Sequence, residues 1–272
     1  MLPKYLMFST QSSGKKGDEV KAIQMALPIW TQTSNILKVD GVFGEDTKSA
    51  VKEFQSQMNL QVDGVVGKTT GSLLGIWRTL EKGFDISHWN SIVWDQVPLE
   101  FSFVNIKATE GVTYTDPSFF SSVKQASYAN LDVGAYHFTK FANKPYEEAS
   151  NFVNALIESK CEFTNVYLDL EYRTSELKNE QILEWSLEFL NYVSKYVSPK
   201  TKVGVYTSSN YLREINLQYV SDLKCFELWA ADWNSQPLVA PWSEWSCWQF
   251  TNQGLEDWSA TPLDLNYRIK SK

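Results

Sequence analysis

The sequence predicts an α/β fold: an irregular parallel β/α barrel of eight strands and about five helices, preceded by a small all-α domain of three helices. Three observations support this prediction. A turn motif recurs at an offset of 23 residues early in the chain, and apolar strand candidates alternate with amphipathic helices after residue 82. The last connections are short and contain proline, which excludes full helices there.

The small domain is predicted from the repeated turn. VDGVFG at 39–44 recurs as VDGVVG at 62–67, and Thr47 is matched by Thr70. Each Asp-Gly pair predicts a tight turn, and each threonine is expected in the helix start that follows. Together with the helical spacing of the apolar residues around the turns, this predicts a compact three-helix unit of about 65 residues. These apolar residues are Val20, Ile23, Leu27, Ala50, Val51, Phe54 and Met58.

The barrel is predicted from strand and helix periodicity. Helical segments join the early strands, which implies right-handed crossovers, whereas 234–245 and 252–262 are too short and broken for helices. We therefore expect the sheet to close without helices there and the site to lie at the carboxyl ends of the strands. The strand candidates are 83–89, 102–109, 132–138, 165–171, 202–208, 226–233, 246–251 and 263–269, and the helical segments are 118–130, 145–159, 179–197 and 209–223.

The change of pattern predicts three segments: a domain over 1–78, a linker over 79–82 and a barrel over 83–272. Residues 1–82 carry a net charge of +2 and the rest −9. The two parts of the sequence therefore carry net charges of opposite sign.

Composition excludes several functions. The 272 residues are 43% hydrophobic and 21% charged with a net charge of −7, which is typical of a soluble globular protein. No apolar run of about 18 residues and no secretion signal is evident, so we expect no membrane partner. Three dispersed cysteines and two histidines predict neither disulfides nor a zinc site, and nucleotide and nucleic-acid motifs are absent.

Acidic residues mark the ends of three strand candidates. Asp85 follows Gly83-Phe84, Asp169 and Glu171 end the strand at 165–171, and Asp264 opens the last one. Because strand side chains alternate, Asp169 and Glu171 are expected to point together into the barrel, where crowding raises the pKa of one of them. Such a pair suits glycoside cleavage. Structural pairing and divalent-cation binding are the alternatives.

Both parts resemble known families. Residues 14–76, with VDGVFGEDT, AVKEFQ and VDGVVGKTT, are similar to the three-helix peptidoglycan-binding domain. Residues 83–270 resemble glycoside hydrolase family 25, the N-acetylmuramidases called Chalaropsis-type lysozymes. The matching stretches are GFDISHWN, KATEG, YTDPSF, GAYHF, YLDLE, GVYTS, LWAADW, WQF and LDLN.

The second resemblance implies roles for the acidic residues. Glu171 would be the general acid/base, Asp169 would stabilise positive charge or hold the substrate acetamide, and Asp85 and Asp264 would tune protonation. A covalent and an acetamide-assisted retaining mechanism both stay open. The residues expected to line the sugar groove are Tyr136, Tyr206, Trp229, Asp232, Trp233 and Gln249. His137 is expected to be structural, and Asn266 to orient Asp264. Lys107 and Glu110 are expected either to support the site or to form an internal ion pair. His88 and Trp89 are expected to border the groove or to pack in the core.

The resemblances imply hydrolysis of the β-1,4 bond between N-acetylmuramic acid and N-acetylglucosamine in bacterial peptidoglycan, by a monomer without a cofactor. A non-catalytic wall-binding protein is the alternative, and a chitinase-like enzyme is disfavoured because YLDLE lacks the earlier acids of DxxDxDxE. In lacking a secretion signal and disulfides, the sequence resembles that of a phage endolysin, an enzyme that is made in the bacterial cytoplasm and released through a holin. A bacterial autolysin would contain the same two modules.

Overall fold

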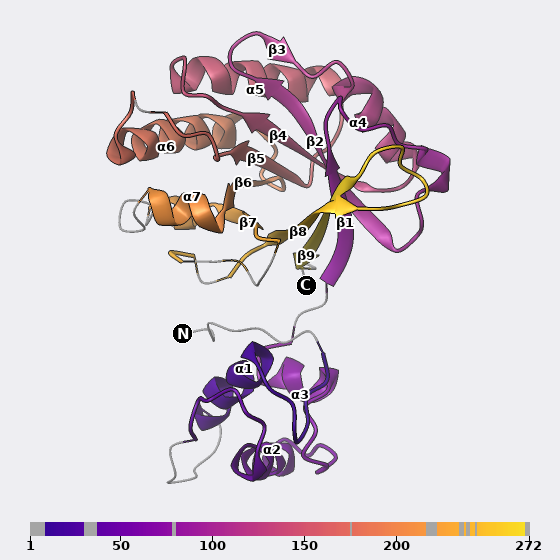
Figure 1. The fold of residues 1–272 in the computed structure, drawn as a ribbon, viewed down its shortest axis with the longest axis vertical. Helices are drawn as coiled ribbons and strands as arrows, with labels where there is room; N and C mark the ends of the chain where they lie inside the picture. Colours follow the sequence, from indigo (N-terminus) through magenta and orange to yellow (C-terminus); the bar gives the residue numbers. More distant parts are fainter. Residues whose placement is uncertain are drawn as a thin grey trace. The chain divides into compact units, whose positions relative to one another are not determined.

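The computed structural model describes residues 9–29, 37–77, 80–174, 176–215, 222–233, 237, 240–242 and 244–269 (Figure 1). The chain divides into two compact units, the first ending at Leu80 and the second running from Glu81 to Ile269. Strand β1 already begins at Leu80, so residues 80–82 of the predicted linker belong to this strand. Residue 79 lies outside the described residues.

The first unit contains the three predicted α-helices. They are α1 (Asp18–Ala26), α2 (Glu45–Gln57) and α3 (Lys68–Leu73), and the 3-10 helix η1 (Leu27–Ile29) follows α1. Their apolar faces meet in one core, as the helical spacing predicts. Its large buried side chains are Val20, Ile23, Leu27, Phe43, Val51, Phe54, Val66, Leu74 and Ile76.

A buried glutamine organises the first repeated turn. The Gln24 carboxamide donates through Nε2 to Asp40 Oδ1 at 3.0 Å and to Thr47 Oγ1 at 3.1 Å. Its Oε1 accepts the backbone N–H of Gly41 at 2.8 Å. Gly41 has φ of 74°, a left-handed conformation that glycine adopts without strain. One side chain therefore connects α1, the turn and the start of α2.

The second turn repeats this arrangement with Gln55 of α2. Its Nε2 donates to Asp63 Oδ1 at 2.8 Å and to Thr70 Oγ1 at 3.3 Å, and its Oε1 accepts the N–H of Gly64 at 2.9 Å. Gly64 also has φ of 74°. The sequence repeat thus reflects a repeated hydrogen-bond motif that builds the fold.

The second unit is a closed barrel, which confirms the predicted fold class. Eight strands form the ring β1-β9-β8-β7-β6-β5-β4-β2, and a β1–β2 pairing closes it. The two-residue strand β3 pairs with the outer end of β2 and had not been predicted. The strands are β1 (Leu80–Ile86), β2 (Phe101–Glu110), β3 (Tyr114–Thr115), β4 (Asp132–Phe138), β5 (Asn165–Asp169), β6 (Lys202–Ser208), β7 (Glu227–Ala231), β8 (Cys247–Gly254) and β9 (Leu263–Ile269).

One strand departs from the parallel order that the sequence predicts. β8 is parallel to β7, but β9 is antiparallel to β8. A short connection produces this arrangement, because an antiparallel pair needs no crossover helix. The start of β9 therefore lies at the same end of the barrel as the carboxyl ends of the other strands.

Helices cover the outside of the early strands (Figure 1). The helix expected over 209–223 is shorter than predicted: it ends at Glu214 with Ile215 as its cap, and 216–221 lie outside the described residues. The described part of the barrel contains α4 (Phe119–Tyr128), α5 (Pro145–Ser159), α6 (Asn179–Tyr196), α7 (Ser209–Glu214) and the 3-10 helix η2 (Trp94–Gln96).

The interior of the barrel is filled by side chains, mostly aromatic. Trp229 is 1% exposed, and its ring lies 4.6 Å from that of Tyr206 and 5.1 Å from that of Tyr167, centroid to centroid. Phe103, Ala231 and Cys247 complete this buried cluster. The site above it therefore has a packed and rigid floor.

Candidate active site

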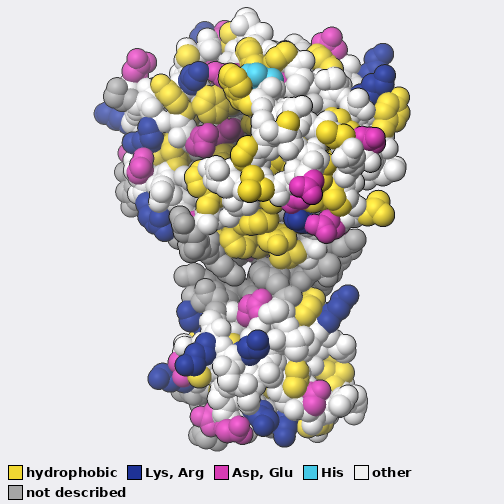
Figure 2. Space-filling model, turned by 45° about the vertical axis from the view of Figure 1, so that its right-hand side comes forward, with side chains coloured by type: hydrophobic (Ala, Val, Ile, Leu, Met, Phe, Trp, Pro, Cys, Tyr) yellow, Lys and Arg dark blue, Asp and Glu magenta, His cyan; other side chains and the backbone are white. Residues whose placement is uncertain are grey.

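The strand directions bring the four predicted acidic residues to one mouth of the barrel. Asp85 lies near the end of β1, Asp169 ends β5, and Glu171 follows two residues later. Asp264 is the second residue of β9, and it reaches the same mouth because this strand runs against its neighbour. Figure 2 shows acidic side chains in a hollow of the barrel unit bordered by hydrophobic side chains.

Glu171 lies beyond the strand that was expected to hold it. β5 ends at Asp169, but the N–H of Leu170 still donates to the carbonyl of Tyr206 at 2.8 Å. The chain therefore continues beside β6 for one more residue. Asp169 is buried and Glu171 is exposed, so the two carboxyl groups differ in environment although they stand two residues apart.

Asp85 is held by two carboxamides. Its Oδ2 accepts Nε2 of Gln249 at 3.0 Å and Nδ2 of Asn266 at 2.7 Å. Burial raises the pKa of Asp85 well above its usual range, and the nearby Asp264 carboxylate raises it further, against the effect of the two amides. Burial also raises the pKa of Asp264, to about 6.

Asp169 is 6% exposed, and its Oδ1 has no hydrogen-bond partner among the described residues. Burial raises the pKa of Asp169 well above its usual range, and the Glu171 carboxylate adds to this effect. The pKa of Glu171 is also raised, first by desolvation and then by Asp264, while Lys107 opposes the shift. A carboxyl group that keeps its proton near neutral pH can act as a general acid.

A β-bulge brings a lysine to this mouth. The register of β2 against β4 shifts between Lys107, which lies beside Tyr136, and Thr109, which lies beside His137. Bulges redirect side chains in this way. As a result Lys107 shares a face with Glu110, and its Nζ lies 2.9 Å from Glu110 Oε2.

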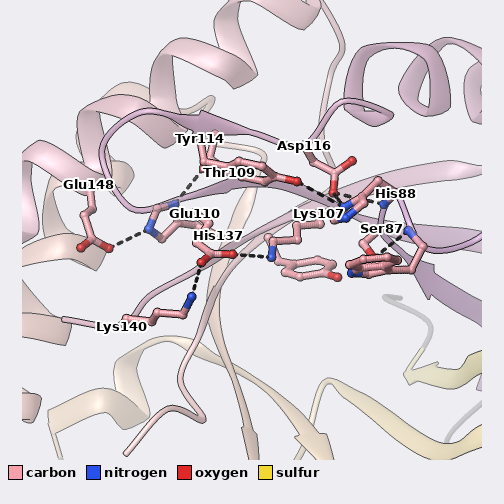
Figure 3. A network of polar contacts seen from close by, with 12 residues as sticks. Ser87, His88, Lys107, Thr109, Glu110, Tyr114, Asp116, His137, Lys140 and Glu148 are labelled. Atoms are coloured by element: carbon pink, nitrogen blue, oxygen red, sulfur yellow. Dashed lines mark hydrogen bonds and ion pairs between the residues drawn. The ribbon is translucent and has the colours of Figure 1, made fainter. Parts of the chain in front are cut away.

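Figure 3 shows the polar network around this bulge. Glu110 Oε1 also contacts Lys140 Nζ at 2.6 Å, so this carboxylate joins two lysines. His137 is fully buried and uses both ring nitrogens, with Thr109 Oγ1 at 2.7 Å and Glu148 Oε2 at 3.0 Å. These contacts fit the structural role expected for His137.

Trp89 does not pack in the core, which was one of its two expected places. Its ring is 77% exposed and lies 4.4 Å from that of His88. The buried Asp116 accepts from both the backbone N–H and Nδ1 of His88, at 3.1 and 2.8 Å. Asp116 therefore fixes the turn after β1 through His88 (Figure 3), while the indole of Trp89 is exposed to solvent.

The residues expected to line the sugar groove lie at different depths. Trp233 is 52% exposed, whereas Tyr206, Trp229 and Gln249 are buried at 8%, 1% and 2%. Tyr136 and Asp232 are half-buried. Among these six side chains, that of Trp233 is therefore the most exposed, and those of Tyr206, Trp229 and Gln249 are buried.

Sequence reasoning missed the contact between Asn266 and Asp85. Asn266 was expected to orient Asp264, but its Nδ2 donates to Asp85 Oδ2 and, at 3.3 Å, only to the backbone carbonyl of Asp264. The available signal was the i, i+2 spacing of Asp264 and Asn266, which puts both on the barrel-facing side of β9. Pairing with β1 could not be deduced from this spacing.

The described residues contain no group of three or more His, Cys, Asp or Glu side chains that could hold a metal ion. They also contain no helix long and apolar enough to cross a membrane.

Two family models match the chain. The model "Glycosyl hydrolases family 25" matches residues 84–257, and a peptidoglycan binding domain model matches residues 16–74. The first match covers most of the barrel unit, and the second covers the three helices.

Individual relatives agree with the first match. The autolytic lysozyme of Clostridium acetobutylicum is 30% identical over 168 residues, which cover 60% of this chain and 47% of that protein. Lysozyme M1 of Streptomyces globisporus is 28% identical, covering 68% and 66%. This chain thus spans about half to two thirds of these relatives. The crystal structure of the CTP1L endolysin is 27% identical with a TM-score of 0.59, covering 70% of this chain and 66% of that one.

Proposed function

Because the chain belongs to glycosyl hydrolase family 25, we propose that its barrel hydrolyses the β-1,4 bond between N-acetylmuramic acid and N-acetylglucosamine in bacterial peptidoglycan. The observation that carries this proposal is the cluster of four carboxyl groups at one mouth, whose pKa values are all raised, first of all by desolvation.

In this mechanism Glu171 protonates the glycosidic oxygen. It is the exposed member of the cluster, and its raised pKa favours the acid form that this step needs. Once the leaving group departs, the carboxylate of Glu171 takes a proton from the attacking water. Asp169 lies deeper, where it stabilises the positive charge of the transition state or orients the acetamide of the substrate. The burial of its unpartnered oxygen supports this role.

The three-helix unit retains the enzyme on the wall. Its match to a peptidoglycan binding domain supports this role. Most of the matched residues of its internal repeat hold the fold together, as the contacts of Gln24 and Gln55 with the two turns indicate. The wall therefore contacts other residues, on the exposed surface of this unit.

The biological setting that we infer is phage-induced lysis, with release through a holin, and a bacterial autolysin is the alternative. Similarity to an endolysin structure supports the first setting, and similarity to an autolytic lysozyme supports the second. Expression of the chain inside bacteria, with and without a holin, distinguishes them. Lysis that requires the holin supports the endolysin, whereas lysis without it contradicts this setting.

The test of the activity is mass spectrometry of fragments released from purified peptidoglycan, with new sugar ends reduced before analysis. We expect reduced muramic acid ends with the wild type and with Glu158→Gln, an exposed residue of the outer helix α5. We expect none with Glu171→Gln. Reduced glucosamine ends or free stem peptides would identify a different hydrolase, and no release from several wall types would favour a non-catalytic binding protein.

A further inference from the structure

The described part of the chain exposes tryptophan side chains only at the mouth that holds the acidic residues. Trp89 is 77% exposed and stands three residues after the end of β1, and Trp233 is 52% exposed and stands two residues after the end of β7. The other described tryptophans are buried or half-buried. Because an indole gains much by leaving water, two exposed indoles at one mouth point to a ligand that covers them there.

Hydrogen bonds on two sides fix the turn that carries Trp89. On one side, the buried Asp116 accepts the backbone N–H of His88 at 3.1 Å and contacts its Nδ1 at 2.8 Å (Figure 3). On the other side, Asn90 Nδ2 donates to Thr261 Oγ1, in the connection between β8 and β9, at 3.3 Å. The His88 ring lies 4.4 Å from the indole, centroid to centroid. The indole therefore has a fixed place before any ligand binds, which lowers the entropic cost of binding.

The surroundings of Trp89 favour a sugar over a protein partner. Its neighbours in the turn are the polar residues Ser87, His88 and Asn90. The hydroxyl of Tyr114 lies 3.3 Å from His88 Nδ1 and adds a further polar group. A single aromatic face among polar groups is complementary to a pyranose, whose C–H groups pack on the ring while its hydroxyls form hydrogen bonds. In β-1,4-linked N-acetylglucosamine and N-acetylmuramic acid, both faces of each ring present such C–H groups.

The strand order separates Trp89 from the proposed acid. β1 and β5 are separated in the ring by β2 and β4. Neighbouring strands lie about 4.8 Å apart, so the strand end that carries Trp89 lies roughly 14 Å along the barrel wall from the one that carries Glu171. This separation exceeds the length of one pyranose unit. β7, which carries Trp233, lies on the other side of β5, so Glu171 stands between the two indoles in the strand order.

We propose that Trp89 is the stacking platform of a remote sugar subsite, which binds a pyranose of the glycan strand beyond the two units that share the cleaved bond. The subsite makes the enzyme select long glycan strands over short ones. Its binding energy is the same before and during the reaction, so it lowers KM and leaves kcat unchanged. This inference rests on the proposed hydrolase function.

The test is the chain-length dependence of KM for full-length variants. The substrates are soluble oligosaccharides of alternating N-acetylglucosamine and N-acetylmuramic acid without stem peptides. For Trp89→Ala we expect KM to rise about tenfold on the longest oligosaccharide, the loss of one aromatic stack, with kcat unchanged. On the shortest one that the wild type cleaves, KM should stay the same, because this substrate ends before the platform. Trp89→Phe retains an aromatic face and should restore most of the binding.

Tyr128→Ala is the matched control. Tyr128 is 72% exposed and ends α4, which leads to the start of β4 and therefore lies at the opposite end of the barrel. Removal of this exposed ring should leave KM unchanged at every chain length.

Calorimetric titration with the longest oligosaccharide measures binding without turnover. In the Glu171→Gln background, addition of Trp89→Ala should raise Kd about tenfold. This measurement keeps the two proposals distinguishable, because it tests the platform even if the wild type releases no muramic acid ends.

Three results would overturn the proposal. An equal rise in KM at all chain lengths would place Trp89 beside the cleaved bond, and an unchanged KM and Kd on the longest oligosaccharide would show that the indole binds no sugar. A loss seen only with fragments that retain stem peptides would make the platform a peptide site.

Discussion

At the scale of single residues, Asp169 carries a conflict between function and stability. Its carboxyl group is buried, and Oδ1 has no hydrogen-bond partner among the described residues. The pKa raised by burial means that the carboxylate is less stable in the folded protein than in the unfolded chain. The fold keeps this unfavourable charge at the position where a glycosidase needs a negative group.

Asp169→Asn is therefore expected to stabilise the protein at pH 7 while abolishing activity. A folded pKa above the unfolded value of about 3.9 stabilises the fold below that pH, and this contribution is lost as the pH rises through the folded pKa. Denaturation should show a higher free energy of unfolding for Asp169→Asn than for the wild type at pH 7, and this gain should vanish near pH 4. The exposed control Asp95→Asn should show neither effect, and equal stability of Asp169→Asn and wild type at pH 7 would contradict the account.

The same residue scale shows what the sequence could predict about the site. Asp85, Asp169, Glu171 and Asp264 were identified because acids at strand ends are conspicuous in apolar strands. The burial of Gln249 was not predictable, since polar residues at the mouth and one layer beneath it have the same strand periodicity. Depth inside a barrel depends on strand tilt and stagger, which a single sequence does not encode locally.

At the scale of elements, periodicity located the strands but not their directions. The alternation of apolar and polar residues has a period of two whichever way a strand runs. The antiparallel direction of β9 could therefore not be predicted from the sequence. The bulge in β2 was missed for a related reason, because Lys107 and Glu110 share a face only after the register shifts. β3, with two residues, is too short to show a period at all.

The repeated turns of the three-helix unit allow a matched test of an element. Gly64 has φ of 74°, and a Cβ there would lie 2.9 Å from Lys48 Cγ, whereas no atom lies within 4 Å of a Cβ at Gly67. We expect Gly64→Ala to destabilise this unit by about 1–2 kcal/mol through left-handed backbone strain. Gly67→Ala, at φ of −91°, should change its stability by about 0.5 kcal/mol or less.

Chemical denaturation of the full chain measures both variants. Equal losses for the two alanines would show that the left-handed turn is not what the repeat preserves. A loss confined to Gly64→Ala supports the view that the turn and its buried glutamine form one structural motif.

At the scale of the whole molecule, the two units have separate cores, and we assign catalysis to the barrel and wall binding to the three-helix unit. The barrel contains all four acidic residues of the site, and the three-helix unit has a core of its own. The opposite net charges of the two parts of the sequence are consistent with this division, because a bacterial wall is anionic and repels the acidic barrel.

Removal of residues 1–77 should therefore separate binding from catalysis. A tethered wall-binding unit raises the effective concentration of the barrel at an insoluble substrate, but adds nothing for a short soluble glycan. We expect the shortened chain to release fragments from intact walls at least about tenfold more slowly while its kcat/KM on a soluble fragment is unchanged. If charge attraction contributes to wall binding, added salt should reduce the difference between the release rates of the full-length and shortened chains on intact walls, because salt screens exposed charges. An equal loss on both substrates would mean instead that the barrel needs the first unit to fold or to complete its site.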